Sequence, residues 1–346
     1  MARDPAGALG DWTSSDTVAV TISDRTRPLD PLPALAALAE RLPNHRVVIG
    51  LGLHRKMTPD ELAPWASLGA IQHDPDDVVA TKDVRGVPGL VHRSIADAAW
   101  CVSVGVAEPH QYAGFSGGHK GVAIGCGGRA TIAALHARDR VMDPGVRIGA
   151  VEGNPFREIV DELGEAARCL LALVWVPAAK VWIAGEPRAV IAEASRLGAP
   201  WYPVARRYER VLLKVPASKG SSLYQASRAA TYLALSPRPP LEPGARLVIE
   251  APCPEGLGAE EGFSRALARC RPPWTELLEG DEPTGAGAQR AVILALVAEH
   301  YQIELTGVQD PEPFRAVGIA ATSERAAPRR DWLVVEEPFV AIPQLA

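Results

Sequence analysis

Residues 104–138 read VGVAEPHQYAGFSGGHKGVAIGCGGRATIAALHAR, and the rest of the chain is best understood outward from this stretch. Three histidines, one lysine and seven glycines lie between its first and last histidine. The apolar run 100–105 that leads into it predicts a buried strand ending in a loop. Glycines let the backbone approach a bound group, and Gly117-Gly118 before Lys120 is typical of a loop that offers N–H donors to a phosphate. A structural loop needs one or two of these features, so we take the stretch as the candidate functional centre.

The composition is that of a globular protein. The chain has 346 residues, of which 47% are hydrophobic and 22% charged, with a formal net charge of −5. This charge predicts no nucleic-acid partner, and the absence of an apolar run of ~20 residues or an apolar N-terminal signal predicts a cytoplasmic protein without a membrane partner. Five cysteines without a C-x-x-C pair indicate neither a disulfide framework nor a thiolate zinc site.

The first part of the chain alternates predicted strands and helices. Residues 17–23 and 46–50 have the apolar, β-branched pattern of strands, and 32–42 has helical spacing. Thr58-Pro59-Asp60-Glu61 is typical of a helix start, with threonine at the cap, proline in the first turn and glutamate three residues on. This rhythm predicts a parallel α/β sheet, whose ligands bind beyond the carboxyl ends of the strands.

The remaining pattern extends the α/β reading over the whole chain. We expect helices at 155–167, 187–197, 224–235 and 288–301, a strand pair at 170–176 and 180–184, further strands at 210–215 and 246–250, a stiff connector at 236–244 and a final strand at 332–336. The predicted fold has two α/β domains with mostly parallel sheets and an interdomain active-site cleft. The expected domains are 1–205 and 206–329, with 330–346 packing back on the first.

Two chemical readings of the central stretch stay open on the residues alone. Gly114-Phe115-Ser116-Gly117-Gly118 fits the G-x-S-x-G elbow of serine hydrolases, although a polar segment separates it from the preceding strand. The three histidines lack the H-x-x-x-H spacing of a zinc site, but one of them is able to serve as a single metal ligand. Lys120 is suited to contact a phosphate or to form a covalent link.

The stretch also resembles the signature of the nickel-pincer-nucleotide enzymes of the lactate racemase family. The matching segments, in order and spacing, are Glu108-Pro109-His110, Ala113 to Lys120, Thr131-Ile132, His136 and Gly153-Asn154-Pro155. The resemblance extends to Asp24-Arg25-Thr26-Arg27-Pro28, Gly52-Leu53-His54-Arg55, Tyr224-Gln225-Ala226-Ser227-Arg228 and Glu255-Gly256-Leu257-Gly258. It therefore covers both halves of the chain, and we identify the chain as a member of this family.

The resemblance implies a role for each matching residue toward the cofactor. Lys120 matches the lysine that carries the pyridinium pincer nucleotide through a thioamide, and His136 matches the protein's own nickel ligand. The soft sulfur donors of the cofactor and one imidazole suit square-planar nickel(II). Asp24, Ser116, Gly117 and Gly118 are expected to contact the cofactor.

The resemblance likewise implies the residues that act on the substrate. His54 and His110 match two histidines that serve as general base and acid on opposite faces. Arg27 matches the arginine that holds the substrate carboxylate, while Gln225 and Arg228 match positions that line the substrate from the second domain.

The predicted function is therefore an isomerase, a racemase or epimerase of a 2-hydroxy acid. Its α-hydrogen is a poor acid beside a carboxylate, so the family removes it as hydride and returns it to either face of a keto acid. Alternatives are a C2 epimerase of a sugar acid, a non-catalytic paralogue that binds the cofactor or a keto acid, and a serine hydrolase using Ser116. Expected partners are the small-molecule substrate and the cofactor-biosynthesis proteins that load the enzyme, while the oligomeric state stays open.

Three residues depart from the family pattern. His119 stands where an arginine is usual, Ile124 where a proline is usual, and Arg228 where a lysine is usual. A guanidinium and an ammonium are not interchangeable around a carboxylate, so we expect these changes to bear on which hydroxy acid is the substrate.

Overall fold

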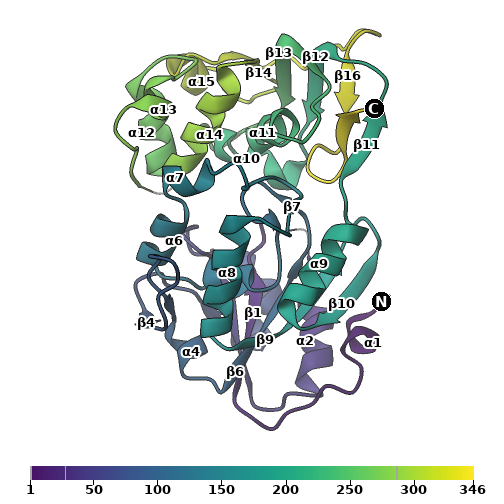
Figure 1. The fold of residues 1–346 in the computed structure, drawn as a ribbon, viewed down its shortest axis with the longest axis vertical. Coiled ribbons are helices and arrows are strands. Elements are labelled where there is room, and N and C mark those ends of the chain that lie inside the picture. Colours follow the sequence, from purple (N-terminus) through teal and green to yellow (C-terminus); the bar gives the residue numbers. More distant parts are fainter. Residues whose placement is uncertain (1, 28, 286) are drawn as a thin grey trace. The chain divides into compact units, whose positions relative to one another are not determined.

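The computed structural model describes residues 2–27, 29–285 and 287–346; Pro28 of the Asp24–Pro28 motif therefore lies outside the described residues. The chain forms two compact units, Met1–Ala199 and Pro200–Ala346 (Figure 1). Each unit is built on its own sheet, and both sheets are mostly parallel. The predicted mixed α/β class is confirmed.

The first unit contains a six-stranded sheet in the order β10-β9-β6-β1-β2-β3. Its strands are β1 (Val18–Ser23), β2 (His45–Gly50), β3 (Ile71–Gln72), β6 (Trp100–Val106), β9 (Cys169–Val176) and β10 (Val181–Gly185). All neighbouring pairs are parallel except β9 with β10, which form the predicted strand pair and are antiparallel. The chain runs outward from β1 to β2 and β3, then crosses to β6 on the other side of β1. The boundary between β1 and β6 is therefore a switch point of the topology, where ligands bind in such sheets.

Alternating side chains of each strand enter different cores. Val18, Val20 and Ile22 of β1 join a cluster that contains Leu35 and Leu38 of α2 (Leu32–Ala39). Ala19, between them, joins a second cluster on the other face. A sheet covered on both faces explains why β6 is buried at every position and reads as a continuous apolar run.

The other elements of the first unit surround this sheet. The helices are α1 (Pro5–Leu9), α3 (Pro59–Leu62), α4 (Arg93–Ala96), α5 (Lys120–Ala123), α6 (Arg129–Leu135), α7 (Arg138–Val141), α8 (Pro155–Ala166) and α9 (Pro187–Leu197), with the 3-10 helix η1 (Ala63–Leu68). Two short antiparallel pairs are β4 (Val78–Ala80) with β5 (Leu90–His92) and β7 (Pro109–His110) with β8 (Gly114–Phe115). The predicted cap of α3 is a complete capping box between Thr58 and Glu61.

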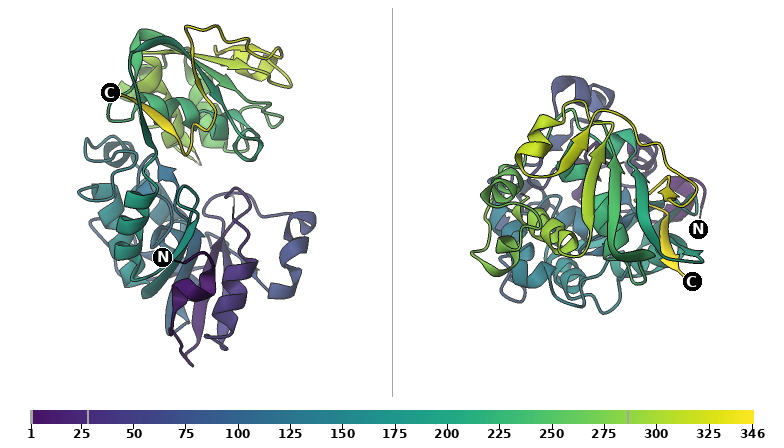
Figure 2. Two further views of the ribbon diagram at one scale, coloured as in Figure 1. Left: turned by 90° about the vertical axis from the view of Figure 1, so that its right-hand side faces the viewer. Right: turned by 90° about the horizontal axis from the view of Figure 1, so that it is seen from above.

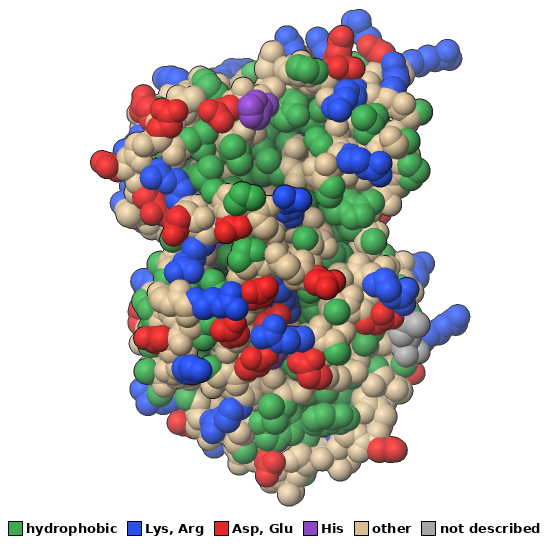
Figure 3. Space-filling view, viewed as in Figure 1, with side chains coloured by type: hydrophobic (Ala, Val, Ile, Leu, Met, Phe, Trp, Pro, Cys, Tyr) green, Lys and Arg blue, Asp and Glu red, His purple; other side chains and the backbone are tan. Residues whose placement is uncertain are grey.

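Helix α8 shows how an amphipathic sequence is used. Phe156, Val160 and Leu163 are buried, and Arg85 binds Glu158 and Glu162 on the outer face at 2.8 and 2.6 Å. Acidic and basic side chains are interleaved over this helix in the space-filling view (Figure 3). The exposed face of α8 is a solvated, charge-balanced surface.

The second unit has a five-stranded parallel sheet in the order β15-β14-β13-β12-β16 (Figure 2). Its strands are β12 (Tyr208–Lys214), β13 (Leu241–Glu250), β14 (Gln302–Thr306), β15 (Ala320–Thr322) and β16 (Leu333–Val335), and a separate parallel pair joins β11 (Trp201–Val204) to β17 (Ile342–Leu345). The helices are α10 (Leu223–Ala226), α11 (Arg228–Ala234), α12 (Glu261–Arg269), α13 (Glu276–Glu279), α14 (Ala288–Ala298) and α15 (Glu312–Ala316), with the 3-10 helix η2 (Ala217–Lys219).

Three local predictions for this unit need correction. The predicted helix 224–235 is two helices, α10 and α11, that meet at Ser227. Part of the predicted connector 236–244 is strand, because β13 already begins at Leu241 and its Leu241 pairs with Tyr208. The strand near 332–336 is present as β16 but is not the last, since β17 follows it.

Candidate active site

The first pair of site residues is His54 and Asp24, which follow the carboxyl ends of β2 and β1. These strands are parallel neighbours, so the loops after them emerge side by side. The Nδ1 atom of His54 lies 2.8 Å from Oδ2 of Asp24, and the other carboxylate oxygen accepts hydrogen bonds from the backbone N–H and the hydroxyl of Thr26 at 3.1 and 2.5 Å. Asp24 is 8% exposed.

The electrostatics of this pair favour an ionised Asp24. Burial by itself raises the pKa of the carboxyl, but the hydrogen bond and charge of His54, together with Thr26 and Arg27, outweigh burial and hold the pKa at about 2. A carboxylate accepts hydrogen bonds only, so Nδ1 of His54 carries a proton. Nε2 is then the nitrogen through which a neutral His54 accepts a proton, and Asp24 stabilises the imidazolium that results.

The second pair joins the two strands at the switch point. Arg27, in the loop after β1, places Nη1 3.4 Å from Oε2 of Glu108, which follows β6. Glu108 is buried and Arg27 is partly exposed, with side-chain exposures of 4% and 18%. The guanidinium is thereby held at the carboxyl edge of the sheet. We did not assign Glu108 a role from the sequence, although it belongs to the Glu108-Pro109-His110 motif.

His110 lies on β7 of the short β7–β8 hairpin, and its ring has a defined orientation. Its Nδ1 accepts hydrogen bonds from the backbone N–H groups of Tyr112 and Ala113 at 3.3 and 3.2 Å. A nitrogen that accepts from N–H groups carries no proton, so a neutral His110 has its proton on Nε2. Neutral His110 therefore presents an N–H donor at Nε2, whereas neutral His54 presents an acceptor at Nε2. The hairpin requires Gly114, with φ of 71°, because a Cβ there would lie 1.8 Å from the carbonyl oxygen of Ala150.

His136 and His110 belong to one aromatic cluster. Tyr112 lies between them, with ring centroids 5.8 Å from His110 and 5.4 Å from His136, and Phe156 packs against both Tyr112 and His136 at 5.7 and 5.4 Å. The sequence reasoning missed Tyr112 and Phe156. Their only signal was position, since Tyr112 lies inside the central motif and Phe156 directly follows Gly153-Asn154-Pro155.

The hydrogen bonding of His136 is compatible with a role as a metal ligand. His136 follows the last residue of α6, and its Nδ1–H donates to the carbonyl oxygen of Ile132 at 2.8 Å. This contact leaves the lone pair on Nε2, and a backbone carbonyl on the far nitrogen is the usual partner of a ligating histidine. No cluster of three or more His, Cys, Asp or Glu side chains among the described residues is placed to hold a metal ion. His136 thus fits a metal for which the protein supplies a single ligand.

Lys120 begins the short helix α5, with only His119 between it and the glycine pair Gly117-Gly118. The helix packs closely on the sheet because position 121 is glycine: a Cβ at Gly121 would lie 2.4 Å from Oγ of Ser103 on β6. Lys120 itself is partly buried. This arrangement anchors the backbone of the lysine next to the switch point.

The neighbours of Lys120 in the motif are held by the protein itself. Ser116 is 4% exposed, and its hydroxyl donates to the carbonyl oxygen of Val106 at 2.6 Å and accepts from the N–H of Glu108 at 3.0 Å. A Cβ on Gly118 would lie 2.7 Å from Cγ1 of Ile191, so α9 packs directly on this backbone. Ser116 is thus engaged in structural hydrogen bonds, not poised as a nucleophile; contacts of Ser116, Gly117 and Gly118 with a cofactor stay predictions.

His119 points into the protein. It is 0% exposed, its Nδ1 lies 3.0 Å from Oδ1 of Asp161, and its Nε2 lies 3.2 Å from the carbonyl oxygen of Cys169. Burial raises the pKa of Asp161, but His119 and Arg157 outweigh it and the net pKa is lowered. Gly164 makes room for this side chain, since a Cβ there would lie 2.5 Å from three atoms of His119, two of them in the ring. Both ring nitrogens are therefore engaged within the fold.

The second-unit residues form a group of their own. Arg228, 8% exposed, donates from Nε to the backbone carbonyl of Gln225 at 3.2 Å and from Nη2 to its side-chain oxygen. Its guanidinium carbon lies 5.5 Å from the ring centroid of Phe339. The Glu255–Gly258 motif supports this group, because the N–H groups of Leu223 and Tyr224 at the start of α10 donate to the carbonyls of Gly256 and Leu257. The two motifs of this unit are thus in direct contact.

Comparison with known proteins places these features in a family. The family profile described as the lactate racemase N-terminal domain matches residues 9–149. The lactate racemase of Thermoanaerobacterium thermosaccharolyticum is 24% identical over 173 residues, which are 45% of this chain and 40% of that protein. The lactate racemase of Lactiplantibacillus plantarum is 27% identical over 157 residues, 41% of this chain and 37% of that protein. The matched segments thus span about two fifths of these curated relatives.

The fold similarity is more extensive. The lactate racemase apoprotein from T. thermosaccharolyticum superposes with a TM-score of 0.81 over 97% of this chain and 88% of that chain, at 18% identity. A protein of known structure from Thermotoga maritima superposes with a TM-score of 0.72 over 98% of this chain and 96% of that chain, at 15% identity. Profile, sequence relatives and fold agree: residues 9–149 match the lactate racemase N-terminal domain, and the chain is a homologue of the lactate racemases.

Proposed function

We propose that the chain is an isomerase that racemises or epimerises a 2-hydroxy acid with a lysine-tethered nickel-pincer nucleotide. The observation that carries the proposal is the tautomer of His136: its Nδ1–H donates to the carbonyl oxygen of Ile132 at 2.8 Å, so the lone pair of the neutral ring is on Nε2, the nitrogen by which such a histidine coordinates a metal. His136 shares one aromatic cluster with His110 through Tyr112, and this proximity supports the proposed pairing of a metal ligand with an acid–base group.

The residues present suit the cofactor. Lys120 supplies an amine for the covalent link, and His136 supplies one imidazole to a nickel held otherwise by the cofactor. When bound, the nickel-pincer nucleotide provides the acceptor and donor of hydride that the reaction needs. We further propose that cofactor-biosynthesis proteins load the enzyme and that it works in the cytoplasm. None of the described helices has the length and apolar character to span a membrane.

The protein's own part is to bind the acid and to move its hydroxyl proton. Arg27, held by Glu108, grips the carboxylate of the substrate, and Gln225 and Arg228 supply further substrate contacts. His54 takes the hydroxyl proton on Nε2, and the resulting imidazolium is stabilised by the ionised Asp24. Oxidation of the alcohol carbon gives a planar keto acid, which is reduced again on either face.

The two histidines are not equivalent. His110 enters the reaction as a hydrogen-bond donor through Nε2–H. For His110 to alternate between acid and base, its Nδ1 must gain a proton, and the hydrogen bonds from Tyr112 and Ala113 must then break. We therefore propose that His54 is the base in the resting enzyme. His110 alternates between acid and base only when the β7–β8 hairpin moves.

The decisive experiment is performed on protein purified from its own organism. The mass of the peptide containing Lys120 and the nickel content are measured first, and racemisation is then followed by chiral chromatography with exchange of the α-hydrogen. A nucleotide-sized adduct with near-stoichiometric nickel, and activity lost in His54→Gln but kept in His300→Gln at an exposed position, is the expected result. An unmodified Lys120 without nickel contradicts the cofactor; an adduct without exchange of the α-hydrogen contradicts the isomerase.

A further inference from the structure

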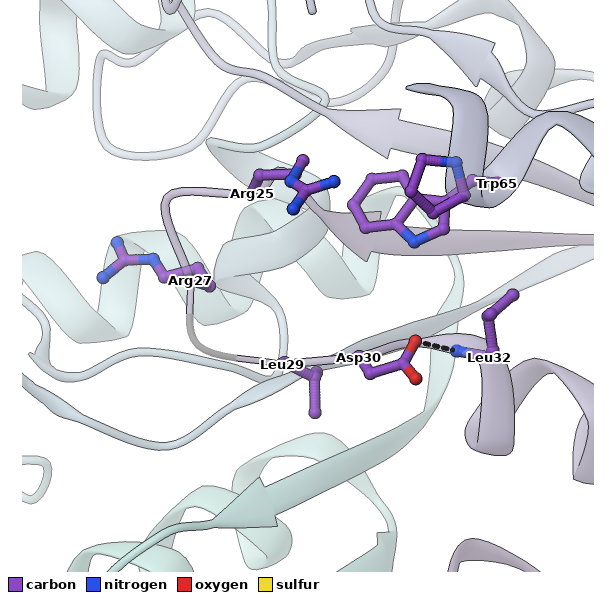
Figure 4. Close-up of a pocket in the computed structure, with 7 residues that line it drawn as sticks. Arg25, Arg27, Leu29, Asp30, Leu32 and Trp65 are labelled. Carbon is purple, nitrogen blue, oxygen red and sulfur yellow. Dashed lines mark hydrogen bonds between the residues drawn. The ribbon is translucent and has the colours of Figure 1, made fainter. Parts of the chain in front are cut away.

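Two groups of charged side chains lie in the first unit close to the candidate site, and they differ in burial. Arg25 and Asp30 line an open hollow of about 260 Å³, from which the guanidinium of Arg27 is directed away (Figure 4). Both Arg25 and Asp30 are exposed. The second group is buried beside the turn that leads into Lys120. Its members are His119, Arg157 and Asp161, with exposures of 0%, 1% and 4%. Buried charges persist only when they are paired and hydrogen-bonded, so the contacts of this group define its protonation.

Asp161 supplies the negative charge of the buried group. Its Oδ1 lies 3.0 Å from Nδ1 of His119 and 3.0 Å from Nη2 of Arg157, and its Oδ2 accepts from Nε of Arg157 at 3.1 Å. Arg188, which is half-exposed and also bound to Glu165, lies 3.6 Å from Oδ2. Burial raises the pKa of Asp161, but His119 and Arg157 outweigh it, so the carboxyl is ionised. A carboxylate only accepts hydrogen bonds, and Nδ1 of His119 therefore carries a proton.

The second ring nitrogen of His119 also faces an acceptor. Its Nε2 lies 3.2 Å from the carbonyl oxygen of Cys169, where the pairing of β6 with β9 shifts register and is locally disrupted. The thiol of Cys169 is neutral, because its hydrogen bond with Cys101 and its burial raise its pKa. A neutral imidazole has one N–H, so one of its nitrogens would turn a lone pair toward an oxygen. An imidazolium donates to both oxygens.

The backbone of His119 connects this charge pair to Lys120. The carbonyl oxygen of His119 accepts hydrogen bonds from the N–H groups of residues 122 and 123 at 3.0 and 2.8 Å, and Lys120 is the first residue of the helix they belong to. On the other side of the turn, the hydroxyl of Ser103 donates to the carbonyl oxygen of Gly118 at 2.7 Å. The start of α5, and with it the direction of Lys120, is thus fixed by side chains of the interior.

We infer that His119 is a buried imidazolium that, paired with Asp161, acts as a positioning residue for Lys120. The inference rests on the proposed function only for the part that Lys120 plays. The cost of burying such a pair is offset only when its hydrogen bonds are complete, as they are here, and the loss of one partner leaves an uncompensated charge in the interior. Neutralising His119 therefore loosens the turn that carries the lysine.

The ring protons are measured first. Nitrogen NMR is performed at pH 7 on the unloaded full chain with labelled histidine, and the His119 signals are assigned by correlation with its backbone. Protons on both Nδ1 and Nε2 are the expected result. In Asp161→Asn the ring loses its counter-ion, and a single ring proton is expected. A single ring proton in the parent protein overturns the inference.

Hydrogen exchange then measures the hold on the turn. Amides of residues 121–124 in the unloaded full chain are followed by mass spectrometry. Their exchange is expected to be about 10- to 100-fold faster in His119→Gln, the range set by the loss of one hydrogen bond between charged groups. His119→Arg keeps a positive charge and is expected to restore slow exchange. His45→Gln, at the amino end of β2, is the control and must leave these amides unchanged. Equal acceleration in His119→Gln and His119→Arg overturns the role of the charge.

The mass of the Lys120 peptide, from protein made in its own organism, separates this inference from the proposed function. His119→Gln is expected to lower the share of Lys120 that carries the adduct, and His119→Arg to keep it. Equal adduct in the parent and in His119→Gln contradicts the positioning role and leaves the proposed function standing. An unmodified Lys120 in the parent contradicts the proposed function, whereas two ring protons and faster exchange in His119→Gln still support the ionic anchor of the turn.

Discussion

Nδ1 of His54 lies 2.8 Å from Oδ2 of Asp24. The carboxylate that follows β1 therefore determines the tautomer of the histidine that follows β2. The carboxylate, with a pKa of about 2, is ionised throughout the neutral range. An aspartate in this position orients the ring and stabilises its protonated form, as in other acid–base pairs. The pair is thus the most direct structural support for His54 as a base.

Asp24→Asn tests this relationship. The amide is able to donate to Nδ1 and so favours the tautomer with the proton on Nε2, which removes the base. We expect kcat to fall on the order of 10²–10⁴-fold, the contribution typical of general acid–base catalysis. Nitrogen NMR of labelled His54 must show the tautomer change in Asp24→Asn. The control Asp11→Asn, at an exposed position, must leave the tautomer and kcat unchanged. An unchanged tautomer with full activity would contradict the role of Asp24.

The pH dependence of the unfolding free energy should show the effect of the lowered pKa of His73. It is 1% exposed, and burial, reinforced by the charge of His92, lowers its pKa from 6.5 to about 4. Between these values the unfolded chain binds a proton that the native state does not, so stability falls as the pH drops from about 6.5 to 4. The loss is on the order of 3 kcal/mol.

His73→Gln is the variant for this measurement, because its amide is able to retain the hydrogen bond that His73 Nε2 makes to the carbonyl oxygen of Gly127 at 3.0 Å. Urea unfolding at several pH values should give a flatter profile between pH 6.5 and 4 for the variant. A profile identical to that of the parent would assign the acid sensitivity to other groups.

Packing between His119 and Gly164 is suited to a double-mutant cycle. Gly164→Ala places a Cβ 2.5 Å from the ring of His119 and is expected to cost about 1–3 kcal/mol of unfolding free energy. In the background of His119→Ala the same change should cost much less, because the ring is gone. Additive costs in chemical denaturation would show that the two residues do not compete for this space.

Ser116→Ala separates the isomerase from the hydrolase. The hydroxyl bonds both the carbonyl of Val106 and the N–H of Glu108, so its removal is expected to cost about 1–3 kcal/mol of stability. Racemisation by loaded protein at a temperature below its unfolding should be reduced by the loss of one predicted cofactor contact but not abolished. Ser195→Ala, whose hydroxyl bonds within its own helix, serves as the control. An esterase activity abolished in Ser116→Ala alone would instead support the hydrolase.

The sequence alone predicted the local elements and the residues of the central motif. Strand and helix patterns depend on side-chain periodicity within a few turns, which is why β1, β2, β6 and α8 agree with their predicted positions. The same reasoning failed over 224–235, where a continuous helical pattern hides the break at Ser227 between α10 and α11. The resemblance to a known family, not periodicity, predicted the functional roles.

Tertiary structure decided which of these residues meet. Asp24 and His54 are 30 positions apart, and Arg27 and Glu108 are 81 apart, so only the parallel pairing of β1 with β2 and β6 brings their loops together. The fold also turns the side chain of His119, the residue before Lys120, inward to Asp161. The glycine-rich loop at this point is packed against α8 and α9. A linear pattern records which side chains are present and how they alternate, whereas hydrogen-bond partners and tautomers depend on distances that only the folded chain defines.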